Sequence, residues 1–189
     1  MDVIQNALAR HRETMERSIK ILPAQIEKGG TILLEAARQN RRLYICGNGG
    51  SAADSQHFAA EWMCRYKDDR IPLPAIALTT DTSVLTAISN DYAFDDVFSR
   101  QIQALGNPGD VLVAFTTSGR SPNILKAIEA AKRKKMAIIV LTGEGGKELE
   151  TKADCVLAVP SGETARIQEI HELIYHIWCE YIDAHMARA

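Results

Sequence analysis

The chain has few cysteines, almost no net charge and no long apolar run. Its four cysteines are scattered along 189 residues without a Cys-x-x-Cys pair, so their spacing indicates neither a structural zinc site nor a disulfide framework. The formal net charge of -2 gives no basic field for general nucleic-acid binding. No segment approaches the roughly 20 apolar residues of a membrane span, and the charged N-terminus lacks the apolar stretch of a signal peptide. These absences predict a cytoplasmic protein that binds neither nucleic acid nor membrane.

The composition is that of a globular protein with an adequate core. Hydrophobic residues make up 46% of the chain and charged residues 24%, which is unlike a disordered protein. There is no linker composition, fixed-period repeat or low-complexity tract. We therefore predict a single domain over residues 1–189, with an N-terminal helical segment over 1–40 and an α/β core with a long C-terminal helix over 41–189.

The first forty residues have the apolar spacing of helices. A stripe of mostly apolar residues recurs at spacings of three or four: Ile4, Leu8, His11, Met15, Ile19 and Leu22. A second helical stretch runs from about Ala24 to Gln39. This pattern predicts a helical hairpin before the core. The hairpin either covers the sheet or forms a subunit interface, and the sequence pattern leaves both readings open.

After Arg42, short apolar runs alternate with polar turns and helical segments. The segments that begin LYIC, AIAL, DVLVAF and MAIIVL each read as strand, turn and helix, and CVLAVP reads as a final strand. From Thr164 to the end the sequence is typical of one long amphipathic helix. The order predicts an α/β fold, a parallel sheet with helices on both faces. Ligands of such sheets bind at the carboxyl ends of the strands.

The turn after the first strand, CGNGGSAADSQH, has the residues of an anion or hydroxyl site. Gly49 and Gly50 let the backbone approach a ligand, and Asn48 and Ser51 offer hydrogen bonds near a helix N-terminus. A dinucleotide fingerprint is not met, because Ala52 stands where the third glycine is usual. The alternative is a plain tight turn.

A second turn, TTSGRSPN, gathers four hydroxyls before a helix. Thr116, Thr117, Ser118 and Ser121 together predict a phosphate cradle, because helix N-terminal amides attract a dianion. The lysine of a Walker loop is absent, so the phosphate would be bound without itself reacting. Helix capping alone would explain Ser121 but not the whole cluster.

Two pairs of helical residues have the spacing of metal ligands. His57 and Glu61 are four apart, and Gln168 and His176 are eight apart, so each pair shares a helix face. If the faces meet, they offer nitrogen and oxygen donors to a divalent metal such as zinc. His171 competes with His176, since it is three residues from Gln168. Taken singly, each of these residues is more often hydrogen-bonded or solvated.

Four segments together resemble the bacterial phosphoheptose isomerases of the sugar isomerase (SIS) family over nearly the whole chain: CGNGGSAADSQHFAAE, AISNDYAFDDVFSRQ, TTSGRSPN and TARIQEIHELIYH. The resemblance implies a three-layer, flavodoxin-like SIS domain. It also implies a homotetramer with sites at subunit interfaces and one zinc ion per subunit. The implied reaction converts sedoheptulose 7-phosphate to D-glycero-D-manno-heptose 7-phosphate through an enediolate, the first step toward nucleotide-activated heptose for lipopolysaccharide, capsule or other surface glycans.

The same resemblance implies a role for each matching residue. Glu61 and His176 match the catalytic pair, and the implied zinc ligands are His57, Glu61, Gln168 and His176. The implied substrate contacts are Asn48, Gly49, Gly50, Ser51, Glu61, Asn90, Asp91, Thr116, Thr117, Ser118, Ser121 and Gln168.

Two other functions are compatible with a SIS fold. One is a non-catalytic scaffold that binds a replication initiator, and such proteins lack the acid and the second histidine of the catalytic pair. The other is a SIS domain that senses a sugar phosphate or processes an aminosugar. The presence of Glu61 and His176 favours the isomerase.

Overall fold

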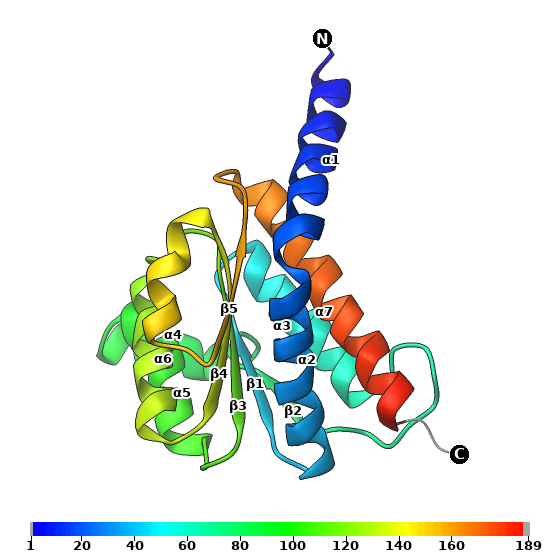
Figure 1. The fold of residues 1–189 in the computed structure, drawn as a ribbon. Coiled ribbons are helices and arrows are strands. Elements are labelled where there is room, and N and C mark those ends of the chain that lie inside the picture. Colours follow the sequence, from blue (N-terminus) through cyan, green and yellow to red (C-terminus); the bar gives the residue numbers. More distant parts are fainter. Residues whose placement is uncertain (1, 187–189) are drawn as a thin grey trace.

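A computed structural model describes residues 2–186, which form one parallel sheet between two layers of helices (Figure 1). The strands are β1 (Leu43–Cys46), β2 (Ala75–Ala77), β3 (Val111–Thr116), β4 (Ala137–Gly143) and β5 (Cys155–Val159). The α-helices are α1 (Val3–Ile21), α2 (Pro23–Arg38), α3 (Gly50–Met63), α4 (Thr82–Asp91), α5 (Val97–Leu105), α6 (Pro122–Arg133) and α7 (Thr164–Met186). Two 3-10 helices are η1 (Phe94–Asp96) and η2 (Glu144–Thr151).

The five strands lie in the order β2-β1-β3-β4-β5, and every neighbouring pair is parallel. All six residues of β3 are buried, as expected for a central strand covered by helices on both faces. Because the strands are parallel, their carboxyl ends meet at one edge of the sheet. The turns singled out in the sequence therefore gather at that edge.

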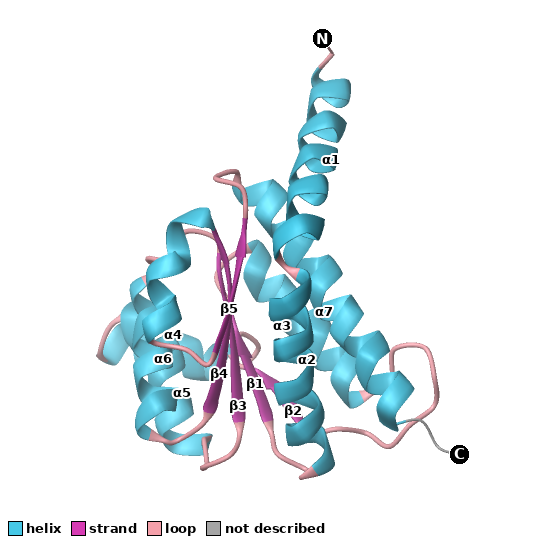
Figure 2. Ribbon diagram, in the orientation of Figure 1, coloured by secondary structure: helices cyan, strands magenta, loops and turns pink. Residues whose placement is uncertain are grey.

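Helices cover both faces of the sheet (Figure 2), and each face carries its own apolar core. On one face, α2, α3 and α7 pack around Phe58, Tyr175 and Trp178. On the other, α4, α5 and α6 pack around residues such as Phe98 and Ile102. The predicted α/β fold with a helix-flanked parallel sheet is confirmed.

The N-terminal helices differ from the predicted hairpin, which is wrong. Leu22 keeps right-handed helical angles between them, and Pro23 begins α2, a position where proline costs no hydrogen bond. The chain therefore continues in nearly the same direction, and α1 projects beyond the sheet (Figure 1). Helical periodicity gives the helices but not the angle between them.

The last helix follows the sequence prediction closely. It begins at Thr164 and ends at Met186, and the final residues of the prediction, 187–189, lie outside the described part of the chain. Along its length α7 packs against α1, α2 and α3. Within residues 2–186, no helix combines the length and the apolar character that crossing a membrane requires.

Candidate functional site

The turns after β1 and β3 lie next to each other at the carboxyl edge of the sheet. β1 and β3 are hydrogen-bonded neighbours, and their turns are joined by the side-chain amides of Asn48 and Asn123. Each of these amides donates to the oxygen of the other, at 2.9 and 2.8 Å. Asn48 is thereby fixed at the start of the site, next to the N-terminus of α3.

The turn after β3 has the features of an anion site. Gly119 adopts φ +71°, and a side chain there would meet the backbone of Gly146, so the turn closes tightly. The hydroxyls of Thr116 and Ser121 lie 3.4 Å apart. Ser121 precedes α6 without a side-chain capping bond, so capping does not account for its hydroxyl. The hydroxyls and the N-terminal amides of α6 remain suited to a phosphate.

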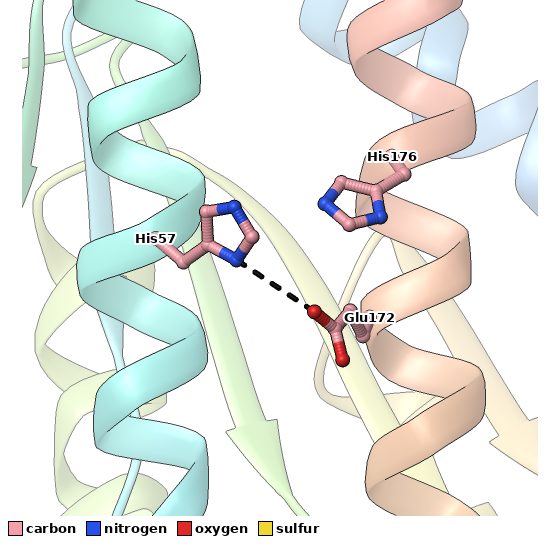
Figure 3. A group of neighbouring side chains, drawn as sticks. All are labelled: His57, Glu172 and His176. Carbon is pink, nitrogen blue, oxygen red and sulfur yellow. Dashed lines mark ion pairs between the residues drawn. The ribbon is translucent and has the colours of Figure 1, made fainter. Parts of the chain in front are cut away.

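A second group of polar side chains lies between α3 and α7. Figure 3 shows His57 on α3 facing Glu172 and His176 on α7. The Nε2 atom of His57 lies 3.2 Å from Glu61 Oε1, and its Nδ1 atom lies 3.8 Å from Glu172 Oε1. The ring centroids of His57 and His176 are 5.1 Å apart. The two predicted helix faces therefore do meet.

These side chains have the donor chemistry of a metal site. One donor atom each from His57, Glu172 and His176 lies within 4.8 Å of the others, and Glu61 touches the same imidazole. Zinc accepts such a mixture of imidazole nitrogen and carboxylate oxygen at bond lengths of about 2.0–2.2 Å. The donors fit a divalent cation once the side chains close around it.

Sequence reasoning missed Glu172. The available signal was its spacing, since Glu172 is four residues from both Gln168 and His176 and lies on the same helix face. Its closeness to His57 depends on how α3 packs against α7, which spacing along α7 does not specify.

Gln168 lies between the two groups of polar residues. A side chain on Gly50 would come 2.5 Å from Gln168 Nε2, so the amide rests against the start of α3. Gln168 is also hydrogen-bonded to Asp54. It thus connects the turns at the sheet edge with the histidines further along α3.

Asp54 is a buried carboxylate beside this site. Burial raises its pKa to about 6, the hydrogen bond from Gln168 opposes the rise, and the nearby Glu172 adds to it. Its Oδ2 atom has no hydrogen-bond partner among residues 2–186. Sequence reasoning gave Asp54 no role.

His171 lies in the core, apart from this group. Its ring is fully buried, with Nε2 3.3 Å from the Thr142 carbonyl oxygen. Burial lowers the pKa of His171 to about 4, so the ring is neutral and belongs to the core. Of the two competing histidines, His176 is the one that faces His57.

Two predicted substrate contacts lie elsewhere in the chain. Asn90 and Asp91 are exposed at the C-terminal end of α4, where the Asn90 amide donates to Asp91 Oδ1 at 2.8 Å. Helix α4 belongs to the layer opposite α3 and α7 (Figure 1). A single chain does not bring these two residues to the histidines.

The chain is similar in sequence and in structure to proteins of one family. The SIS domain family matches residues 8–143. The phosphoheptose isomerase of Bordetella avium is 50% identical over 97% of this chain and 96% of its own length. Two solved structures are also similar over 96% of this chain. The phosphoheptose isomerase of Neisseria gonorrhoeae has a TM-score of 0.90 at 43% identity, over 97% of that chain. The phosphoheptose isomerase of Francisella tularensis has a TM-score of 0.92 at 38% identity, over 96% of that chain.

Proposed function

The chain belongs to the SIS domain family and, within it, to the phosphoheptose isomerases, and we propose that it converts sedoheptulose 7-phosphate into D-glycero-D-manno-heptose 7-phosphate. One observation carries the proposal. Helices α3 and α7 bring an acid and two histidines together, while the polar turns that precede α3 and α6 lie side by side at the carboxyl edge of the sheet. This arrangement suits a phosphorylated sugar whose phosphate is bound at one end and whose carbonyl reacts at the other.

The cradle would bind the phosphate without changing it. Hydroxyls of Thr116, Thr117, Ser118 and Ser121 would donate to the phosphate oxygens, helped by the N-terminal amides of α6. Asn48, Gly49, Gly50 and Ser51 would bind the sugar from the neighbouring turn. Gln168, which touches Gly50, would hold the hydroxyls closest to the reacting carbons.

The acid and the histidine divide the proton transfers. Aldose–ketose isomerisation moves one proton between adjacent carbons and another between their oxygens, through an enediolate. Glu61, half-buried beside His57, would carry the carbon-bound proton. His176 would exchange the oxygen-bound proton, because imidazole both donates and accepts near neutral pH.

The metal of this proposal is zinc, one ion per subunit. His57, Glu61, Gln168 and His176 would hold it. When bound, zinc polarises the substrate oxygens and offsets the negative charge of the enediolate. The closeness of donor atoms from His57 and His176, on α3 and α7, supports a metal between these helices. The third member of that group, Glu172, is the carboxylate that competes with Glu61.

The proposal includes a homotetramer with sites at subunit interfaces. Asn90 and Asp91 would reach the substrate from a neighbouring copy, since their own chain holds them in the opposite helical layer. An apolar groove between α1, α2 and α7 supports association, and it is lined by residues such as Ile19, Leu173 and Tyr181. The cytoplasm, where nucleotide-activated heptoses for surface glycans are made, is the proposed compartment.

Turnover of sedoheptulose 7-phosphate by purified protein tests the function. We expect turnover that a chelator abolishes, added zinc restores and Glu61→Gln lowers at least 100-fold. Glu180→Gln is the matched control, because Glu180 is exposed on α7 and pairs with Lys67. Metal-replete wild-type protein without turnover would refute the isomerase and favour a non-catalytic SIS scaffold. Binding of sugar phosphate without conversion would instead favour a sensing domain.

A further inference from the structure

The two ring nitrogens of His57 have different neighbours. Nε2 lies 3.2 Å from Glu61 Oε1 on the same helix. Nδ1 lies 2.9 Å from the hydroxyl of Tyr175 on α7 and 3.8 Å from Glu172 Oε1. A neutral imidazole binds a metal through one nitrogen and carries a proton on the other. Which nitrogen binds the metal therefore decides whether Glu61 or Glu172 shares it.

Tyr175 is held rigidly at Nδ1. Its side chain is fully buried, and its ring stacks on Phe58 with centroids 5.3 Å apart and an interplanar angle of 21°. It makes T-shaped contacts with the rings of His57 and His176, with centroids 5.5 and 4.8 Å apart. These contacts hold the buried ring, and with it the hydroxyl, beside Nδ1 of His57.

Glu172 is a much weaker competitor for the same nitrogen. Half of its side chain is exposed to solvent, so binding would restrict a mobile and hydrated carboxylate. The 3.8 Å separation also exceeds hydrogen-bond length. The hydroxyl at 2.9 Å is the partner that Nδ1 keeps.

We propose that Tyr175 is a positioning residue that occupies Nδ1 of His57 and so reserves Nε2, on the Glu61 side, for the metal. The inference rests on the metal-dependent function proposed above and goes beyond it by naming the group that selects the ligand atom. It makes Glu61, and not Glu172, the carboxylate that shares the metal with His57.

A tyrosine hydroxyl suits this role because it can both donate and accept. Without metal, Nε2–H donates to the Glu61 carboxylate and the Tyr175 hydroxyl donates to Nδ1. With metal on Nε2, that proton is released to solvent, Nδ1 takes up a proton, and Nδ1–H donates to the Tyr175 oxygen.

The test compares Tyr175→Phe with Tyr44→Phe. Both variants keep the buried ring and lose one hydroxyl, and the Tyr44 hydroxyl donates to the Leu105 carbonyl at 2.7 Å, in the other layer. Zinc affinity of the metal-stripped proteins is measured by competition with a chromophoric chelator. We expect about 10-fold weaker zinc binding for Tyr175→Phe, the loss typical of an outer partner of a metal-bound histidine. We expect no change for Tyr44→Phe.

Two further measurements separate positioning from general structural damage. In ¹⁵N-histidine spectra of the zinc-loaded wild type, His57 should carry its proton on Nδ1. Glu61→Gln should weaken zinc binding at least 10-fold, whereas Glu172→Gln should leave it within twofold.

Several outcomes overturn the inference. These are unchanged zinc affinity in Tyr175→Phe, metal on Nδ1, a loss caused by Glu172→Gln as large as that from Glu61→Gln, or a wild-type protein that binds no zinc. Zinc binding without turnover of sedoheptulose 7-phosphate overturns the isomerase alone, because none of these readouts depends on turnover.

Discussion

At the scale of single residues, the position of Gln168 depends on the absence of a side chain at Gly50. The Gln168 amide lies where a Cβ atom on Gly50 would stand, 2.5 Å from Nε2. Real Cβ atoms essentially never come so close to another heavy atom. The amide would have to leave its place between the sheet-edge turns and His57.

Gly50→Ala should therefore lower catalysis more than it lowers stability. We expect kcat/KM for sedoheptulose 7-phosphate to fall about 100-fold, the loss typical of a 1 Å misplacement in an active site. Alanine is a good helix former, so the melting temperature should change little. Gly162→Ala is the control, because its Cβ would meet only the flexible end of Glu144, at 3.2 Å. Equal kcat/KM values for the two variants would show that catalysis does not depend on the position of the Gln168 amide beside Gly50.

Sequence reasoning reached part of this site for a physical reason. His57 and Glu61 share a helix face, as do Gln168 and His176, because helical spacing fixes it. The structure adds that the two faces meet, with His57 beside Glu61 and His176. Tyr175 and Glu172 were missed because their partners lie on another helix. Such contacts depend on how α3 and α7 pack, which spacing within one helix does not specify.

At the scale of elements, a buried ion pair fastens α3 to α7 beyond the site. Arg70 Nε donates to Asp183 Oδ1 at 2.8 Å, and both side chains are almost fully buried. The same guanidinium donates to the carbonyls of Glu61 and Trp62 at the end of α3. The two helices that carry the site are thus joined near the C-terminal ends of both.

Asp183 should make the fold sensitive to acid. Burial alone would raise its pKa, but hydrogen bonds from the Lys67 amide, Arg70 and the Asp68 amide outweigh it and lower the pKa. A lowered folded-state pKa contributes stability that is complete above the unfolded value of about 4. That contribution is lost as the pH falls through the folded-state pKa.

Asp183→Asn should accordingly destabilise the protein most at neutral pH. We expect the free energy of unfolding in urea to drop by about 3 kcal/mol at pH 7, because Arg70 is left as an unpaired buried charge. The difference from wild type should shrink as the pH falls below the unfolded value of about 4, because the stability that a lowered folded-state pKa contributes is progressively lost there. Glu180→Gln breaks an exposed ion pair with Lys67. This variant should have the same free energy of unfolding as the wild type at each pH. A deficit that stays constant from pH 7 to pH 3 would contradict this account.

The order of elements was predictable, but the path of the first two helices was not. Apolar runs and polar turns marked the strands and helices from Arg42 onward, since each pattern has its own period. The direction of α1 depends on the backbone angles of Leu22 and on contacts with α7, such as the one between His11 and Glu169. A single residue between two helices carries no periodic signal.

At the scale of the whole molecule, apolar residues are left uncovered along α1, α2 and α7. A groove of about 480 Å³ lies between these helices. Ile4, Leu8 and Ile19 on α1 are each at least 60% exposed. An apolar groove with exposed apolar residues on the same helix is typical of an association site, and the proposed homotetramer would cover it.

A charged side chain in this groove should dissociate the tetramer. Turnover should then be lost as well, because the proposed site needs residues from two subunits. Ile19→Glu should shift the mass measured by sedimentation from tetramer toward smaller species, because a carboxylate cannot be buried unpaired. Ile19→Leu keeps an apolar side chain and should remain tetrameric. Turnover should fall in parallel with the tetramer fraction, since Asn90 and Asp91 lie on the layer opposite the histidines of their own chain. Dissociated subunits with full turnover would mean that one chain completes its site alone, and that neither residue contacts substrate from a neighbour.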